Sequence, residues 1–477
     1  MDFLSYEMFG AVGDGRADDM PAIIRTHDEA NRLGLPVRAK EGASYYIAPV
    51  ARTAAIRTDT DWTGARFIID DRGLDDYRAS LFDVLPEGEE VSLPLTSLRY
   101  GQDFVPNPSG KALYVRVVNE NHRDYIRLGA NQNNGHPRTD AFLVSPDGSL
   151  PSPVSFDFDE ITSVEARAVP ETKRILRGGS FTTIANQWES KYDYHARNIH
   201  VRRSNTELSD ISHFVEGELD HGAPYGGFVS IGDCAQVIVR DCLFTGHRIY
   251  WTIGAAGVPV PMGSYDINCG AAASVTFRRC RQTTDIMDRN YWGLIGTNFC
   301  RDLVFEDCVF SRFDAHMGVT NCTIRDSKLG WQCLNAIGFG TFLIENTEAY
   351  GHAFVNLRPD YGCTFRGRFY IRNCVWHPAG DSRCVFSAHN DGTHDFGYVC
   401  RLPEEVDIDG FTVDGETDVL YMFNDWTGKP EGEVKYPMRE PLRVSARGIR
   451  GAKEIRLCRN PALMTGTEAD LGTPGLA

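Results

Sequence analysis

A short pattern recurs along the second half of the chain and limits the available folds more than any other feature. Each copy is a run of β-favouring apolar residues, then two charged or polar residues, then a small residue. The successive small residues are 38, 38, 28, 19, 20 and 27 positions apart, and several of these spacings are one or two multiples of about 19. The copies end at Ser204, Cys242, Cys280, Cys308, Ser327, Thr347 and Cys374, with a weaker copy at Gly410.

The apolar runs alternate with period two, as half-buried strands do. Small residues at equivalent positions would stack in the interior, and the loops between copies are rich in the turn formers Gly, Asn and Asp. The pattern therefore predicts a parallel β-solenoid, in which each rung contacts its neighbours. The competing interpretation, a β-sandwich of antiparallel hairpins, needs tight Asn-Gly or Asp-Gly turns, which are sparse among the copies.

Composition excludes several classes of protein. The 477 residues are 42% hydrophobic and carry a net charge of -16, which favours a large core and disfavours binding to nucleic acid or an anionic membrane. The sequence has no apolar run long enough to span a bilayer. It also lacks a secretory signal, which predicts a cytoplasmic protein, or a secreted one if a signal was removed. Thirteen cysteines without a C-x-x-C motif predict reduced, buried thiols and no zinc site.

The N-terminal run FGAVGDGRADDMPAI, Phe9 to Ile23, resembles the opening of the pectate-lyase-like superfamily of right-handed β-helix proteins. Met8 and Met20 stand where that family usually has Asp and Thr. The resemblance implies an all-β, single-stranded right-handed parallel β-helix with an N-terminal capping helix. That helix would be capped by Asp18 or Asp19 and would bury a face that includes Leu33. It implies no single reaction, because relatives include polysaccharide lyases, glycoside hydrolases, epimerases and phage tailspikes.

Four regions are predicted. Residues 1–84 form the cap and first rungs, and 85–185 form a β-rich inserted or flanking subdomain. Residues 186–460 form the main β-helix, and 461–477 form a loose tail.

The loops that follow each small residue carry most of the polar and aromatic candidates. Stacked rungs would bring these loops into one strip on one face, because neighbouring strands lie about 4.8 Å apart. Residues near positions 288, 314, 335 and 356 should then lie in lateral register, and long glycans bind such strips. The substrate-binding candidates are Tyr250, Trp292, Arg312, Trp331, Asn335, His352, Asn356 and Asp360, and the catalytic candidates are Asp288, Arg289, Tyr291, Asp314, His316 and Arg358.

Asp314 and His316 are two residues apart and would project from the same face of a strand. The pair is similar to the Asp-Pro-His element of alginate-type carbon-5 epimerases, with Ala315 in place of the proline. As surface residues, both should tolerate substitution with a change of less than about 1 kcal/mol in stability.

Two mechanisms compete for these residues. In the first, an arginine (289, 312 or 358) neutralises the carboxylate of a uronate-containing glycan. His316 or Tyr291 then acts as the base for β-elimination, or for epimerisation if the proton returns to the other face. In the second, two carboxylates from Asp288, Asp314 and Asp360 hydrolyse a glycosidic bond. The motifs of the polygalacturonase family are not present as a set, and the abundance of arginine favours the first mechanism.

Other possibilities stay open. The loop with Glu218, Asp220, His221 and Tyr225 could be a lid or a second wall, and the cluster at 389–395 could ligate a metal. No cofactor is expected, although calcium is a possibility because pectate-lyase relatives often use it. A non-catalytic glycan-binding or tailspike-like protein is the alternative to an enzyme, and a homotrimer or other homo-oligomer is possible.

Overall fold

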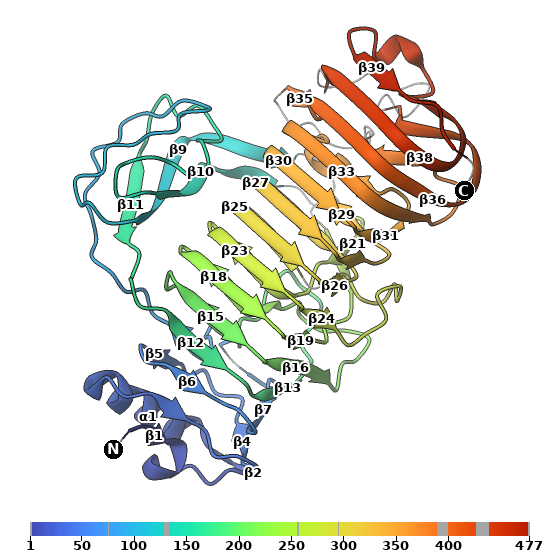
Figure 1. Cartoon of the computed structure of the whole chain (residues 1–477). Helices are drawn as coiled ribbons and strands as arrows, with labels where there is room; N and C mark the ends of the chain where they lie inside the picture. Colours follow the sequence, from blue (N-terminus) through green and yellow to red (C-terminus); the bar gives the residue numbers. More distant parts are fainter. Residues whose placement is uncertain are drawn as a thin grey trace.

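The described residues form one long parallel β-solenoid that runs from the N-terminal helix to the C-terminal strands (Figure 1). The computed structural model describes residues 2–74, 76–127, 133–254, 257–293, 295–388, 399–425 and 438–475. In this part of the chain, 32 strands form one sheet whose pairings are parallel, and three small sheets stand apart from it. No helix among these residues has both the length and the apolar character needed to cross a bilayer.

The elements follow in chain order. The cap, the first rungs and the insertion contain β1 (Leu4–Ser5), η1 (Tyr6–Phe9), β2 (Asp14–Asp18), α1 (Met20–Leu33), β3 (Val37–Arg38), β4 (Ser44–Ile47), β5 (Ala54–Ile56), β6 (Thr60–Asp61), β7 (Arg66–Asp70), β8 (Phe82–Val84), β9 (Leu113–Arg127), β10 (Asn133–Val144) and β11 (Ser163–Ala168). The middle rungs contain β12 (Arg174–Arg177), β13 (Ser180–Ile184), β14 (Ile199–Val201), β15 (Thr206–Ser209), β16 (Ser212–Glu216), β17 (Gly226–Gly232), β18 (Ala235–Arg240), β19 (Leu243–Phe244), β20 (Tyr250–Ile253), β21 (Pro259–Met262), β22 (Tyr265–Gly270), β23 (Ala273–Arg278), β24 (Arg281–Gln282), β25 (Ile295–Glu306) and β26 (Val309–Phe310). The last rungs contain β27 (Phe313–Arg325), β28 (Lys328–Leu329), β29 (Leu334–Asn335), β30 (Gly338–Glu345), β31 (Glu348–Gly351), β32 (Val355–Asn356), η2 (Pro359–Tyr361), β33 (Phe365–Pro378), β34 (Cys384–Ser387), β35 (Cys400–Arg401), β36 (Glu405–Phe423), β37 (Met438–Arg439), β38 (Arg443–Arg456), η3 (Pro461–Leu463) and β39 (Glu468–Leu471).

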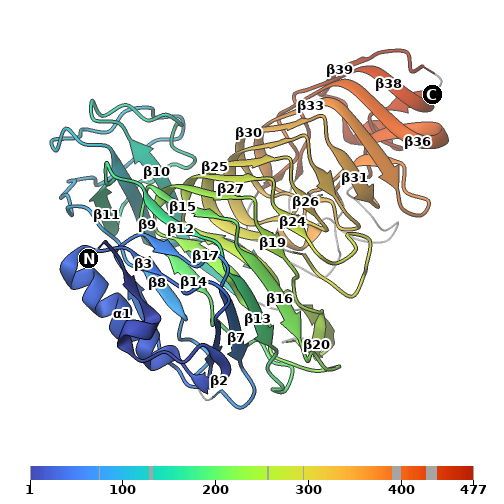
Figure 2. The same ribbon diagram turned by 60° about the horizontal axis from the view of Figure 1, so that its bottom comes forward.

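Helix α1 lies at the N-terminal end of the solenoid, as Figure 2 shows. It follows Asp19, whose side chain does not cap the helix but accepts hydrogen bonds from the main-chain N–H groups of Val12 and Gly13, at 2.6 and 3.1 Å. The aspartate thus fixes the Gly-rich turn that precedes the helix. Leu33, predicted on the buried face, is 44% exposed because it ends the helix beyond the solenoid core.

Six of the small residues that define the repeat stack as one column. The residues that follow them pair in register from rung to rung, Leu243 with Arg281 and so on to Glu348 with Val375. The two outermost copies are displaced: Ile211, not Ser204, precedes the residue that pairs with Leu243, and Cys374 pairs with Phe411, not Gly410. The column therefore consists of Cys242, Cys280, Cys308, Ser327, Thr347 and Cys374.

A left-handed backbone conformation explains the polar residue before each small one. All six of these residues have φ between 47° and 57°, a region that Asn and Asp enter more easily than other non-glycine residues. One residue in this conformation turns the chain sharply into the next strand. The six are Asp241, Arg279, Asp307, Asp326, Asn346 and Asn373.

The thirteen cysteines are all buried, as predicted, and none forms a disulfide. Burial raises the pKa of the Cys300 and Cys333 thiols to about 12. Because the thiolate is the form that reacts with alkylating agents, we expect iodoacetamide to leave the native protein unmodified at neutral pH. Mass spectrometry should find thirteen modified thiols only after unfolding in urea. Rapid modification of Cys308 in the native protein would contradict the stacked column.

The insertion is a separate three-stranded antiparallel sheet in the order β10-β9-β11, with its own hydrophobic core. It stands beside the solenoid in Figure 1, and its Tyr114 hydroxyl donates a 2.5 Å hydrogen bond to the carbonyl of Ala271. The chain returns to the solenoid at β12 and β13, which pair with β6 and β7 before the predicted boundary at 185. At the other end, the stretch predicted as a loose tail contains β39, which pairs with β38.

Candidate functional site

The predicted lateral register is present for three of the four positions. Asp314 pairs with Asn335, and Asn335 pairs with Asn356, so β27, β29 and β32 hold these residues in one row across three rungs. Asp288 is not in this row. It lies on the loop between β24 and β25, where its Oδ1 accepts hydrogen bonds from the main-chain and side-chain nitrogens of Asn290, at 2.9 and 2.8 Å.

Asp314 is completely buried, contrary to the expectation of a surface residue. Its Oδ2 accepts a 2.7 Å hydrogen bond from the Tyr265 hydroxyl, and both carboxylate oxygens lie 2.9 Å from Nη1 of Arg358. Nη2 of Arg312 donates to the same Oδ2. Two guanidinium groups, themselves buried, therefore surround this carboxylate.

The insertion supplies a third arginine to the same group. Arg358 donates to both oxygens of Asp360, at 3.0 and 2.6 Å, and Arg127, the last residue of β9, pairs with Asp360 Oδ2 at 2.7 Å. We call Arg127, Arg312, Asp314, Arg358 and Asp360 the arginine network. Its three guanidinium groups and two carboxylates leave one positive charge.

The arginines keep both aspartates ionised. Burial opposes ionisation of Asp314, but the charges of Arg312 and Arg358 outweigh it and lower the pKa of Asp314 below its usual value. Burial likewise opposes ionisation of Asp360, and Arg358 and Arg127 again lower its pKa. Neither carboxyl group carries a proton near neutral pH, so neither can serve there as a general acid.

His316 is half-buried beside the network, two residues after Asp314 on β27, where the register with β25 shifts by one residue. Its Nδ1 is 2.9 Å from Oδ1 of Asn298, and its Nε2 is 3.3 Å from the Tyr361 hydroxyl. Since the amide oxygen accepts, Nδ1 carries the proton and Nε2 presents its lone pair to the tyrosine. Burial, together with the charge of Arg358, lowers the pKa of His316 to about 3, so the ring is neutral at physiological pH.

Several predicted binding residues pack around this group. The Trp292 ring lies 4.7 Å from the Arg312 guanidinium, whose Nη1 donates a 2.7 Å hydrogen bond to Oε1 of Gln332. The Asn335 amide donates to the Gln332 carbonyl at 2.8 Å, and the Asn356 amide donates to Oδ1 of Asn335 at 2.6 Å. These side chains order the arginine network from the C-terminal rungs.

The remaining candidates are not members of the arginine network. Tyr250 is buried and its hydroxyl is 3.5 Å from Oε1 of Glu218. The main-chain carbonyl of Tyr291 accepts a 3.1 Å hydrogen bond from the indole of half-buried Trp331. Arg289 and His352 are exposed, on the loops after β24 and β31. Tyr291 and Trp331 adjoin Trp292 and Gln332 in the chain, and the roles of all five residues stay predictions.

Sequence reasoning missed Arg127, Tyr265 and Asn298. Asn298 could have been found, because β25 places it beside β27 in the next rung. Tyr265 is the first residue of β22, two rungs away, and Arg127 comes from the insertion, whose sequence does not share the repeat. No spacing argument connects Arg127 to position 360.

The structure also bears on the possible metal sites. In the described ranges, no three His, Cys, Asp or Glu side chains are grouped so that they could hold a metal ion. The cluster at 389–395 lies outside the described residues.

In the Gly-rich loop, Oε1 of Glu218 accepts hydrogen bonds from Nδ1 of His247 and from the Arg248 N–H, at 3.2 and 3.0 Å. The Tyr225 hydroxyl donates a hydrogen bond to the buried Asp71.

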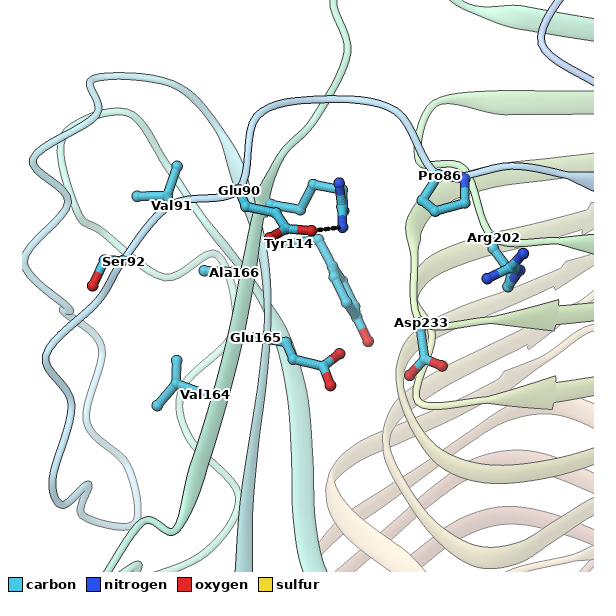
Figure 3. Close-up of a pocket in the computed structure, with 11 residues that line it drawn as sticks. Pro86, Glu90, Val91, Ser92, Tyr114, Val164, Glu165, Ala166, Arg202 and Asp233 are labelled. Atoms are coloured by element: carbon cyan, nitrogen blue, oxygen red, sulfur yellow. Dashed lines mark hydrogen bonds and ion pairs between the residues drawn. The ribbon is translucent and has the colours of Figure 1, made fainter.

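A cavity of about 640 Å³ lies between the insertion and the solenoid, away from the predicted residues (Figure 3). Glu165 faces it from β11 and Asp233 faces it from the solenoid, and Arg116 forms ion pairs with both, at 2.6 and 3.1 Å. Glu90 on the same wall pairs with Arg167. The charged groups of this cavity are thus engaged with one another.

Comparison with known proteins agrees on the fold. The structure is similar to the tailspike protein gp49 of Pseudomonas phage LKA1, with a TM-score of 0.53, 14% identity, and coverage of 94% of this chain and 83% of that one. It is also similar to the tailspike gp61 of Pseudomonas phage phi297, with a TM-score of 0.51, 12% identity, and coverage of 96% and 82%. No known family model matches the sequence, and no curated protein is detectably similar to it.

These likenesses establish the architecture. The chain is a right-handed parallel β-helix with an N-terminal helix and a β-rich insertion, the fold of the pectate-lyase-like superfamily that the N-terminal run resembles. At such low sequence identity these likenesses say nothing about the activity, which must be argued from the residues of the site.

Proposed function

We propose that this protein is a carbohydrate-active enzyme that cleaves a uronate-containing glycan by β-elimination. The observation that carries the proposal is a neutral histidine beside an arginine network with one excess positive charge. The fold supports the general assignment, because the sequence resembles a superfamily that includes many enzymes and proteins that act on polysaccharides.

The arrangement suits removal of a proton next to a carboxylate. The excess positive charge would bind the uronate carboxylate and stabilise the negative charge that develops on it in the transition state. Nε2 of His316 would take the proton from the adjacent carbon, and that electron pair would form a carbon–carbon double bond as the glycosidic C–O bond breaks. The leaving oxygen would receive a proton from the Tyr361 hydroxyl, which is hydrogen-bonded to Nε2. The phenolate would then recover a proton from Nε2 of His316, which returns both groups to their starting state. Return of a proton to the opposite face would instead give epimerisation.

Hydrolysis by paired carboxylates is the alternative reaction. It requires one carboxyl group to stay protonated as the general acid. Arg358 binds both Asp314 and Asp360 and lowers the pKa of both, and Asp288 is hydrogen-bonded within its own turn. These observations favour elimination over hydrolysis.

A non-catalytic glycan-binding protein is the alternative from another class. The observation in its favour is the burial of Asp314, because a buried ion-pair network serves equally well to hold the insertion against the solenoid. In either case the proposed partner is a polysaccharide or oligosaccharide, and assembly into a homo-oligomer is part of the proposal.

A panel of acidic and neutral polysaccharides separates these functions. Ultraviolet absorbance from unsaturated uronate products would support elimination, and new reducing ends without that absorbance would support hydrolysis. Binding without either product would favour the glycan-binding protein and overturn the proposed reaction.

Within this proposal, we expect His316→Ala to lower turnover about a hundredfold, because a positioned base contributes at least that much. His377→Ala is the matched control, since His377 is a partly exposed histidine whose Nδ1 binds Asp414 on another face.

Because the pKa of His316 is about 3, the ring stays unprotonated and can act as a base until the pH falls close to that value. Turnover should therefore not decrease through protonation of His316 above that pH. Initial rates across pH check this, and full activity of His316→Ala would remove the histidine from the reaction.

A further inference from the structure

A second cavity, of about 220 Å³, lies between the insertion and the C-terminal rungs. Tyr125 of β9 forms part of its wall, and the Tyr125 ring also contacts the ring of Tyr361, which lies against His316. The cavity is therefore a near neighbour of the arginine network but is lined by different side chains. It is smaller than the roughly 300–1,000 Å³ of pockets for drug-sized ligands, which suits a single sugar ring or part of one.

Aromatic rings form one wall of this cavity. Phe156 of the insertion and Phe339 of β30 are in contact, with their ring centroids 4.3 Å apart. The guanidinium of Arg138 lies 5.3 Å from the Phe156 ring, and that of Arg366 lies 3.5 Å from the ring of Tyr100. The rings of Phe156 and Tyr100 thus pack against the side chains of Arg138 and Arg366.

The arginines of the cavity differ in how well they are neutralised. Arg138 makes two hydrogen bonds to Asp124, at 2.8 and 2.9 Å, and needs no further partner. Arg366 and Arg401 share the carboxylate of Glu404, whose Oε1 is 3.8 and 3.6 Å away, too far for a hydrogen bond. The Nε–H of Arg366 is buried and, among the residues that the structure describes, has no hydrogen-bond acceptor.

A fourth arginine lies beside the cavity. Arg439 of β37 pairs in register with Arg401 of β35. Burial lowers the pKa of Arg401, and the like charges of Arg366 and Arg439 lower it further. Among the described residues, three arginines (138, 366 and 401) and two aspartates (124 and 157) line the cavity, in a chain whose overall charge is -16. Glu404 and the exposed Arg439 lie beside it and add one charge of each sign. A bound anion would stabilise both a buried hydrogen-bond donor that lacks an acceptor and an excess of guanidinium charge.

We propose that this cavity binds the carboxylate of an acidic sugar through Arg366 and Arg401. A carboxylate in the cavity would accept a hydrogen bond from the Nε–H of Arg366. Guanidinium groups bind planar carboxylates in a bidentate manner. The Phe156 and Phe339 rings offer an apolar face to the sugar. The choice of a sugar rests on the proposed function, whereas the need for an anion rests on the cavity alone.

The test measures equilibrium binding of D-glucuronate by ligand-observed NMR. D-glucose is the control sugar without a carboxylate, and inorganic sulfate is the control anion without a sugar ring. We expect glucuronate to bind at least tenfold more tightly than glucose, and Arg366→Gln and Arg401→Gln each to weaken it at least tenfold. Arg368→Gln is the matched control, because Arg368 is a half-exposed arginine of β33 that pairs with Glu405 outside the cavity. Glu404→Gln should strengthen binding severalfold, since it removes the competing carboxylate.

Each outcome decides the proposal. Equal binding of glucuronate and glucose, or unchanged binding in both arginine variants, would overturn it. If the two arginine variants lose affinity for sulfate and glucuronate equally, and the wild type binds glucuronate no more tightly than sulfate, the assignment to a sugar would be overturned. A folding defect cannot mimic the expected pattern, because Glu404→Gln acts in the opposite direction. His316→Ala should bind glucuronate at this cavity as the wild type does, so failure of the proposed reaction is distinguishable from failure of this site.

Discussion

Replacing Asp314 with alanine is expected to destabilise the protein by about 3–5 kcal/mol, the usual cost of breaking a buried ion pair. The carboxylate is fully buried and accepts hydrogen bonds from Arg312, Arg358 and Tyr265. Its removal leaves two guanidinium groups without their shared partner in a dry environment. The position in a repeat loop suggested a surface residue. The correction follows from Arg312, two residues before it, and from Tyr265 and Arg358, which converge on it from other rungs.

Urea unfolding of Asp314→Ala and Asp288→Ala would measure this cost. Asp288 is the matched control, because its carboxylate lies on a loop and is hydrogen-bonded to Asn290 alone among the described residues. We expect a change of less than about 0.5 kcal/mol for the control. Equal stability of the two variants would show that the arginine network contributes nothing to the fold.

The pH dependence of this effect has a defined sign. The pKa of Asp314 is lowered in the folded protein, against burial, by Arg312 and Arg358. Such a group stabilises the fold fully above its unfolded pKa, about 3.9, and the stabilisation is lost as the pH falls through the folded value. The difference in unfolding free energy between the wild type and Asp314→Ala should therefore narrow below about pH 4.

The solenoid could be predicted from the sequence because its geometry is local and repeated. A small residue after a polar residue in the left-handed conformation marks each of the six corners, and that polar residue is Asp or Asn at all of them except Arg279. The prediction failed at the ends of the column, where Ile211 and Phe411 occupy the equivalent positions and no small residue marks them. Large side chains are tolerated there, so spacing alone could not identify those corners.

The candidate site was predictable only in part. The row of Asp314, Asn335 and Asn356 follows from counting along the rungs, because parallel pairing converts sequence period into proximity. The burial of Asp314 does not follow, since it depends on Arg358 folding back after β32 and on Arg127 arriving from the insertion. Contacts between a repeat and an insertion have no period, and the structure is needed to find them.

Arg301 is one of the buried contacts that hold the insertion on the solenoid, and Arg301→Ala is expected to release the insertion. Nη2 of Arg301 lies 2.8 and 2.7 Å from the two carboxylate oxygens of Asp140 and 2.6 Å from the Ser155 hydroxyl, and its Nε donates to the Ala141 carbonyl at 3.1 Å. Arg301 belongs to β25 and the other three to the insertion, and both ionic partners are almost fully buried. Loss of the Arg301 guanidinium leaves the Asp140 carboxylate buried without its cationic partner. We expect this to lower the stability of the interface by about 3–5 kcal/mol.

Because the insertion has its own core, this cost should appear as undocking rather than as global unfolding. Hydrogen exchange in β9–β11 and limited proteolysis near the connection at 169–173 should both accelerate in Arg301→Ala, while exchange in the N-terminal rungs stays unchanged. Arg325→Ala is the matched control, since Arg325 is a partly exposed arginine of the adjacent β27 that pairs with Glu306. The double variant Arg301→Ala, Asp140→Ala should recover part of the loss, because it removes the stranded charge. If Arg301→Ala exchanges and cleaves as slowly as the control, the remaining contacts, which include Tyr114 with Ala271 and Arg127 with Asp360, are sufficient to hold the insertion in place.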